Sequence, residues 1–222
     1  MRVPGTLGRL VAGALLASLV GLGCMETQAS SEVPFTHDFT DCGDKWLQEE
    51  TDQYSFSCED GQYHFVAKSA ATNQSSLTKL SEPEDRIRIS VDAAVSDIEG
   101  ESAVGLGCWH GASDTAPGYR VFVGLSGWEI LKEREDGTAE DIPSEESGLQ
   151  PRVDGEVISL RTDCLAGVSD TEVKIFINGT LVGTGHDDAG VDQFDEVGMM
   201  ISVDKAPVAV DFDNFQVEVA RP

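Results

Sequence analysis

The chain has 222 residues, of which 40% are apolar and 25% are charged, which suits one folded domain of sandwich or barrel size. Acidic residues number 40 against 15 lysines and arginines, so the net charge is −25 and the isoelectric point is near 4.2. Such a charge repels phosphate backbones, and nucleic acid is therefore excluded as a partner. The composition alone indicates no reaction.

The first element is an export signal. Arg2 and Arg9 accompany an apolar stretch that ends at Leu22, and Gly23-Cys24 follows. This pattern predicts a signal peptide over residues 1–23, which is too short for a permanent membrane span. The run Leu22-Gly23-Cys24 resembles a bacterial lipobox, which implies a lipid on Cys24 and a lipoprotein anchored to the outer face of the bacterial cell membrane. An ordinary cleaved signal that happens to end near a cysteine is the alternative.

Residues 24–34 are small and polar, end in proline, and are expected to form the lipidated N-terminus and a short tether. Cleavage before Cys24 would remove two arginines and no acidic residue, so the net charge would change from −25 to −27. The membrane is thus an expected partner through the lipid anchor.

Cysteine parity supports this interpretation. Five cysteines are odd in an exported protein, and lipid on Cys24 leaves Cys42, Cys58, Cys108 and Cys164 to pair in an oxidising compartment. Three pairings exist. We favour Cys42 with Cys58, which closes a short loop around a predicted hairpin, and Cys108 with Cys164, which ties two predicted core strands. No Cys/His spacing typical of a zinc site is present.

From residue 35 onward the apolar pattern has a period of two, which is typical of half-buried strands. Predicted strands follow in chain order at residues 86–93, 118–123, 128–134, 156–162 and 173–177. Asn178-Gly179 predicts a type I′ turn before a returning strand at Leu181-Val182. Many short strands without helices predict an all-β fold, an antiparallel β-sandwich or jelly roll, over residues 35–222.

The most specific pattern spans Val104 to Ile142, where Gly-Leu-Gly-Cys ends one strand, Gly-Tyr begins the next, and Trp-x-Ile-x-Lys follows a tight turn. Downstream lie Leu-Arg-Thr-Asp-Cys, ending at Cys164, and Asp-Phe-Asp-Asn-Phe, ending at Phe215. The series resembles the concanavalin A-like lectin/glucanase (laminin G-like) jelly-roll domains of bacterial, mainly actinobacterial, surface lipoproteins. The resemblance implies two antiparallel sheets, a concave face that in some relatives grips carbohydrate, and a disulfide between Cys108 and Cys164.

No catalytic pattern stands out. The paired glutamates on one strand that glucanases of this fold use are absent, and the nearest acidic clusters, at Glu133 to Asp136 and Asp192 to Glu196, are expected to be turns. The four histidines and the lack of Gly-x-Ser-x-Gly argue against a nucleophilic hydrolase.

A binding surface is the favoured site. Aromatic rings stack on the apolar faces of sugars, while Arg and His hydrogen-bond to hydroxyl groups. The candidate carbohydrate-binding residues fall on neighbouring predicted strands or their ends: Trp109, His110, Tyr119, Arg120 and Trp128. Core packing is the alternative role for Trp109, Tyr119 and Trp128.

Calcium is the candidate cofactor. Oxygen ligands from the first and last strands could come from four aspartates, namely Asp38, Asp41, Asp211 and Asp213. Phe212 and Phe215 break the alternation of the last strand and predict a bulge there.

These patterns predict a cell-surface lipoprotein with a non-catalytic binding module, for which a carbohydrate or cell-wall glycan is the first ligand to consider. A divergent glycan-acting hydrolase is the second hypothesis, and it requires two carboxylates in a deep groove beside Trp109 or Trp128. A protein-interaction or structural domain without a small ligand, with a surface protein as partner, is the third.

Overall fold

The computed structural model describes residues 33–70, 72–96, 100–111, 116–146 and 157–221. The predicted signal peptide, Cys24 and most of the predicted tether lie outside these residues. So do residues 112–115 and 147–156, which include the first residue of the strand predicted at 156–162. The described residues contain no helix, and hence none that is long and apolar enough to span a membrane.

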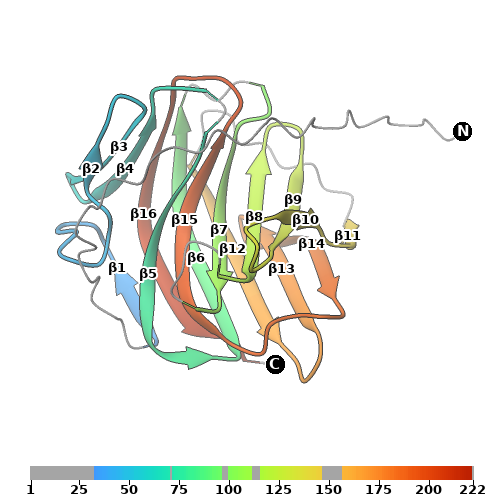
Figure 1. The fold of residues 1–222 in the computed structure, drawn as a ribbon. Coiled ribbons are helices and arrows are strands. Elements are labelled where there is room, and N and C mark those ends of the chain that lie inside the picture. The colour runs from blue at the N-terminus through green and yellow to red at the C-terminus, as the bar shows by residue number, and fades with distance from the viewer. Residues whose placement is uncertain (1–32, 71, 97–99, 112–115, 147–156, 222) are drawn as a thin grey trace, which may run out of the picture.

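Two antiparallel sheets stack face to face and form a sandwich (Figure 1). The ten-stranded sheet has, in spatial order, β11 (Ser144–Glu146), β14 (Thr180–Asp187), β13 (Thr171–Ile177), β12 (Val157–Ala166), β6 (Arg86–Ser96), β16 (Val208–Val219), β4 (Gln62–Ala67), β3 (Tyr54–Glu59) and β2 (Glu49–Glu50), while β1 (Phe35–His37) pairs with β16. The six-stranded sheet has β10 (Ala139–Asp141), β9 (Trp128–Glu133), β8 (Gly118–Gly124), β7 (Ala103–Trp109), β15 (Phe194–Val203) and β5 (Thr72–Glu84). The predicted all-β jelly-roll sandwich is confirmed.

The predicted alternation places one set of side chains between the sheets. In β6, every second residue from Ile87 to Val95 is buried, and β13 shows the same pattern from Val173 to Ile177. Burial of these branched side chains stabilises the sandwich by roughly 1.5–3 kcal/mol for each of the larger ones. Asn178 and Gly179 have φ of 50° and 77°, so the predicted type I′ turn forms between β13 and β14.

The predicted bulge in the last strand is also present. The register between β16 and β6 shifts between Asp213 and Gln216, and Asn214 has a left-handed φ of 54°. Phe212 and Phe215 consequently both face the core and are fully buried.

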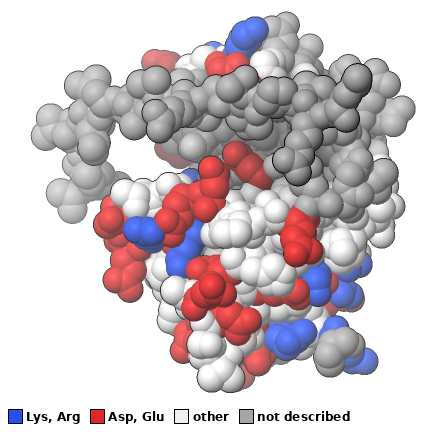
Figure 2. Space-filling view, turned by 90° about the vertical axis from the view of Figure 1, so that its right-hand side faces the viewer, with Lys and Arg blue, Asp and Glu red and all other residues white. Residues whose placement is uncertain are grey.

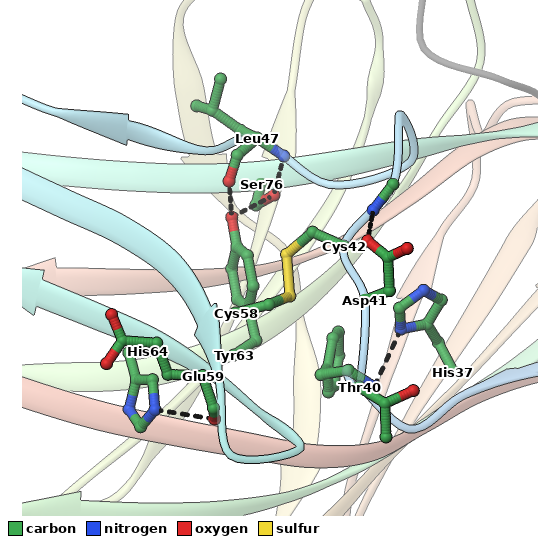
Figure 3. The surroundings of a disulfide bond; sticks show 12 residues. His37, Thr40, Asp41, Cys42, Leu47, Cys58, Glu59, Tyr63, His64 and Ser76 are labelled. Atoms are coloured by element: carbon green, nitrogen blue, oxygen red, sulfur yellow. Dashed lines mark hydrogen bonds between the residues drawn. A yellow bond between two sulfur atoms is a disulfide. The ribbon is translucent and has the colours of Figure 1, made fainter.

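Both favoured disulfides are confirmed. Cys108 of β7 and Cys164 of β12 link the two sheets across the core, with their Cα atoms 6.8 Å apart. Cys42 and Cys58 tie the segment after β1 to β3 (Figure 3). Beside this second bond the Tyr63 hydroxyl donates to the Leu47 carbonyl at 2.6 Å and lies 2.8 Å from Ser76 Oγ, which fixes the same segment against the core.

Acidic side chains dominate the described surface at the edge of the sandwich where β14 and β9 lie (Figure 2). Basic side chains also appear on this face, between and beside the acidic ones (Figure 2). A surface of this kind discourages edge-to-edge pairing with other molecules.

Candidate functional site

The outer face of the six-stranded sheet carries one cross-strand row of large and charged side chains. The row contains Glu133 of β9, Gly118 of β8, Trp109 of β7, Glu196 of β15 and Lys79 of β5. These residues alternate with core residues along their strands, so they point away from the sandwich interior. We call this row and its neighbour Arg120 the tryptophan row.

Trp109 lies flat on the sheet because its neighbours are glycines. A Cβ atom on Gly107 would lie 2.7 Å from Trp109 Cζ3 and 2.6 Å from Met200 Cε, and one on Gly118 would lie 2.6 Å from Trp109 Cδ1. Any side chain at these two positions would therefore displace the indole. Trp109 is only 4% exposed.

Glu133 organises the polar part of the tryptophan row. Its Oε2 accepts a 3.0 Å hydrogen bond from Trp109 Nε1, and its Oε1 accepts one from Arg120 Nη2. Glu133 is 6% exposed, so both interactions are shielded from water. Arg120 keeps an unused donor: its Nε is buried and has no acceptor among the described residues.

An apolar cluster separate from the main core surrounds these groups. It consists of buried Ala103, Trp109, Ala116, Phe122 and Met200, with Leu77 and Leu131 partly buried against it. On this outer face a fixed guanidinium and carboxylate thus lie among buried apolar side chains.

The acidic clusters were expected to be turns, and for their key members this expectation is wrong. Glu133 is the last residue of β9, and Glu196 lies within β15. Both are buried on the same outer face, although acidic stretches in the sequence gave no sign of it. The signal that could have placed Glu133 and Glu196 on the outer face is their strand parity, which is opposite to that of the core residues Ile130 and Val197.

These two glutamates do not form a glycosidase pair. Their strands are separated by β8 and β7, which places the two Cα atoms about 14 Å apart at the usual strand spacing, with Trp109 between them. Retaining and inverting glycosidases hold their carboxylates at about 5–9.5 Å. Glu196 instead faces Lys79, at 3.9 Å.

The other predicted aromatic residues face the interior. Tyr119 is fully buried, and its hydroxyl donates to Asp187 at 2.7 Å. Burial, and then this carboxylate, raise the pKa of Tyr119. Trp128 shares the inward parity of Ile130 and packs where a Cβ atom on Gly183 of the opposite sheet would lie. The two residues therefore belong to the core side of the sheet.

His110 directly follows β7, where its backbone N–H donates to the Pro117 carbonyl at 2.8 Å. Of the five predicted carbohydrate-binding residues, only Trp109 and Arg120 come together on the outer face. The stacking role predicted for Trp109 does not fit its burial, since 4% exposure leaves no ring face for a sugar.

The four predicted calcium ligands have separate partners. Asp38 and Asp41 accept backbone hydrogen bonds from Thr40 and Gly43, in the segment shown in Figure 3. Asp211 pairs with His64 at 2.6 Å, and Asp213 accepts from the Asn214 backbone. No group of three or more His, Cys, Asp or Glu side chains within the described ranges could hold a metal ion, so these four form no ligand set. Calcium binding stays a prediction.

No protein-family model matches the sequence, and no curated protein matches it either. Solved structures do match the fold. A Bacillus subtilis protein of unknown function with a galectin-like fold aligns over 89% of this chain and 100% of its own, at 13% identity and a TM-score of 0.60. A Bacillus licheniformis β-glucanase aligns over 84% of this chain and 98% of its own, at 8% identity and a TM-score of 0.55.

Two further matches carry carbohydrate-related names. Carbohydrate-binding module CBM66 from Bacillus subtilis aligns over 86% of this chain and 99% of its own, at 18% identity and a TM-score of 0.50. A sialidase matches at 10% identity and a TM-score of 0.60, over 88% of this chain, which spans only 19% of the sialidase. At these identities the matches establish the concanavalin A-like, galectin-like fold.

Proposed function

We propose that this protein is an exported, lipid-anchored surface protein whose jelly-roll domain binds a glycan without catalysing a reaction. The observation that carries the proposal is the tryptophan row, where Glu133 fixes Arg120 on an apolar outer face. The names of a carbohydrate-binding module and a β-glucanase among proteins of the same fold support glycan as the ligand class. The N-terminal sequence supports export and lipid attachment at Cys24.

Arg120 is the expected contact. Its side chain is 25% exposed, and its Nε lacks an acceptor in the described part of the chain. The exposed part of its guanidinium would donate to a sugar hydroxyl or carbonyl oxygen, while the buried Nε stays on the protein side. Trp109 acts as a positioning residue beneath it, through Glu133.

The test is a glycan-array screen of the purified full-length protein in detergent, with and without millimolar calcium. Binding that is lost in Arg120→Ala and kept in Arg134→Ala would support the proposal. Arg134 is the matched control because its ion pair with Glu140 lies at an exposed edge of the same sheet. Circular dichroism would verify that both variants keep the sheet structure.

Three results would overturn parts of the proposal. Absence of binding to every glycan would move the assignment to a protein-interaction domain. Release of shorter sugars from a bound glycan would establish a hydrolase. Absence of fatty-acid incorporation at Cys24, measured by metabolic labelling against a Cys24→Ser variant, would remove the lipid anchor.

A further inference from the structure

On the outer face of the ten-stranded sheet, two arginines share one buried carboxylate. Asp163 of β12 accepts from Arg88 Nε and Nη2, both at 2.9 Å, and from Arg161 Nε and Nη2, at 3.1 and 3.3 Å. Asp163 is 5% exposed. One carboxylate neutralises one guanidinium, and Glu218 of β16, directly across from Arg88, balances the second.

The arginines are held in place. The Arg161 guanidinium lies 3.5 Å from the centre of the Phe176 ring, which is its cross-strand neighbour on β13. Each arginine side chain is still 30% exposed, so part of each guanidinium faces solvent. Groups fixed in this way lose little conformational entropy when they bind a ligand.

A surface cavity of about 310 Å³ adjoins this cluster. The described residues that line it are Pro34, Arg88, Glu218, Val219 and Arg221, so among them two guanidinium groups accompany one carboxylate. The volume falls at the small end of the range for ligand sites, roughly 300–1,000 Å³. We call Arg161, Arg88 and Arg221 the arginine strip.

A purely stabilising role does not need three arginines, Arg88, Arg161 and Arg221, beside the two carboxylates of Asp163 and Glu218. One bidentate arginine is enough to pair Asp163, and ion pairs that solvent reaches add roughly 0–1 kcal/mol. In a chain with 15 basic and 40 acidic residues, a local excess of positive charge is uncommon. Guanidinium groups bind planar oxyanions in the bidentate geometry already seen at Asp163.

We propose that the arginine strip binds the oxyanion groups, carboxylate, sulfate or phosphate, of an acidic polysaccharide. This site is separate from the tryptophan row, and it rests on the proposed function only in taking a glycan as the ligand. Glu218 would accept hydrogen bonds from sugar hydroxyl groups in the same cavity. A flat anionic bilayer fits less well, because it faces the repulsion of the whole domain rather than a single cavity.

The experiment measures binding of the full-length protein in detergent to polygalacturonate, dextran sulfate and neutral dextran at 150 mM salt, by biolayer interferometry. At this ionic strength charges beyond about 8 Å are screened, so the arginine strip acts at contact despite the net charge. Arg88→Gln is the first variant, because Asp163 keeps its hydrogen bonds from Arg161, and circular dichroism checks that the sheet structure is kept. Arg134→Gln removes the same charge from an exposed edge of the other sheet and is the control.

We expect Arg88→Gln to weaken binding to at least one charged polymer about tenfold, since a hydrogen bond to a charged group contributes on that scale. Arg88→Gln with Arg221→Gln should weaken it about thirtyfold or more, and Arg134→Gln less than about twofold. The polymer that binds identifies the oxyanion, and neutral dextran should not depend on Arg88.

Equal losses in Arg88→Gln and Arg134→Gln would overturn the inference, as would no binding to either charged polymer. Binding to vesicles that contain phosphatidylglycerol which depends on Arg88, without binding to either charged polymer, would replace it with a lipid surface. The two proposals fail separately. If Arg120→Ala leaves glycan binding intact while Arg88→Gln abolishes it, the tryptophan row is refuted and the arginine strip stands; the reverse result refutes the arginine strip alone.

Discussion

The two outer faces of the sandwich both hold a buried carboxylate bound by arginine, yet they differ in charge balance. Glu133 and Asp163 have side chains that are 8% and 7% exposed. Glu133 takes one arginine and one indole N–H, within an apolar cluster. Asp163 accepts hydrogen bonds from two arginines, and the charged residues Lys174 and Glu218 lie on the same face.

The surroundings of Glu133 and Asp163 differ in how well they solvate an arginine that loses its carboxylate. On the apolar face Arg120 Nε is already buried without an acceptor among the described residues, so loss of its one carboxylate would leave a poorly solvated guanidinium. On the face of the ten-stranded sheet the two arginines are each 30% exposed, and Arg88 also has Glu218 across from it. The same pair of residue types should therefore respond differently to mutation on the two faces.

The largest effect is expected for Glu133→Gln. Arg120 would lose its countercharge on the apolar face, and the free energy of unfolding should fall by about 3 kcal/mol. Urea denaturation measures the change. The control is Glu140→Gln, whose partner Arg134 is half exposed, with an expected loss below about 0.5 kcal/mol. A loss below about 1 kcal/mol for Glu133→Gln would show that the apolar face does not raise the cost of an unpaired charge.

Gly107→Ala tests whether the close packing of the Trp109 indole on Gly107 stabilises the outer face of the six-stranded sheet. The new Cβ atom would overlap the indole and Met200, so the indole must shift and its hydrogen bond to Glu133 must lengthen. We expect a loss of about 2 kcal/mol, as for overpacked sites. Near-ultraviolet circular dichroism and urea denaturation report the two consequences. Native stability together with an unchanged tryptophan spectrum would contradict the described packing.

The alternation of apolar residues was enough to predict the fold, the I′ turn at Asn178-Gly179 and the bulge before Phe215, because these depend on local backbone geometry and burial. Both disulfides followed from cysteine parity and strand order. The alternation along β7 also places the neighbours Cys108 and Trp109 on opposite faces of the sheet.

The site was harder to predict, because its members come from different strands. Glu133 joins Trp109 and Arg120 only through the register of β7, β8 and β9, which no local pattern specifies. Arg88 and Arg161 meet on Asp163 through the pairing of β6 with β12, 75 residues apart for Arg88. Long-range register decides such clusters, whereas the sequence shows only their separate ingredients.

Asp163→Asn tests the carboxylate on the outer face of the ten-stranded sheet. Two arginines would lose their shared countercharge, but both are 30% exposed and can be solvated. The expected loss is about 1 kcal/mol, clearly less than for Glu133→Gln. Urea denaturation of the two variants under one set of conditions gives the ranking. An equal or larger loss for Asp163→Asn would mean that the arginines of the ten-stranded sheet are solvated no better than Arg120.

The smallest effect concerns His64, which pairs with Asp211 at 2.6 Å on the same face as Asp163. Burial alone would lower the pKa of His64, but the hydrogen bond and charge of Asp211 outweigh it, so the pKa is raised above 6.5. A raised pKa in the folded state means that the stabilisation is fully present below pH 6.5 and is lost as the pH rises through the raised value. Because solvent reaches the pair, the loss should be about 0.5 kcal/mol.

Urea midpoints at pH 5.5, 7 and 8.5 would measure this loss. His37 has a lowered pKa, because of burial and then of Lys45, and so contributes with the opposite sign over part of this range. The difference between the wild-type protein and His64→Gln removes that contribution, since His37 is common to both. The difference should shrink from pH 5.5 to pH 8.5. A difference in stability that stays constant from pH 5.5 to pH 8.5 would mean that the charge of His64 adds no stability. The His64–Asp211 pair would then act through its hydrogen-bond geometry alone.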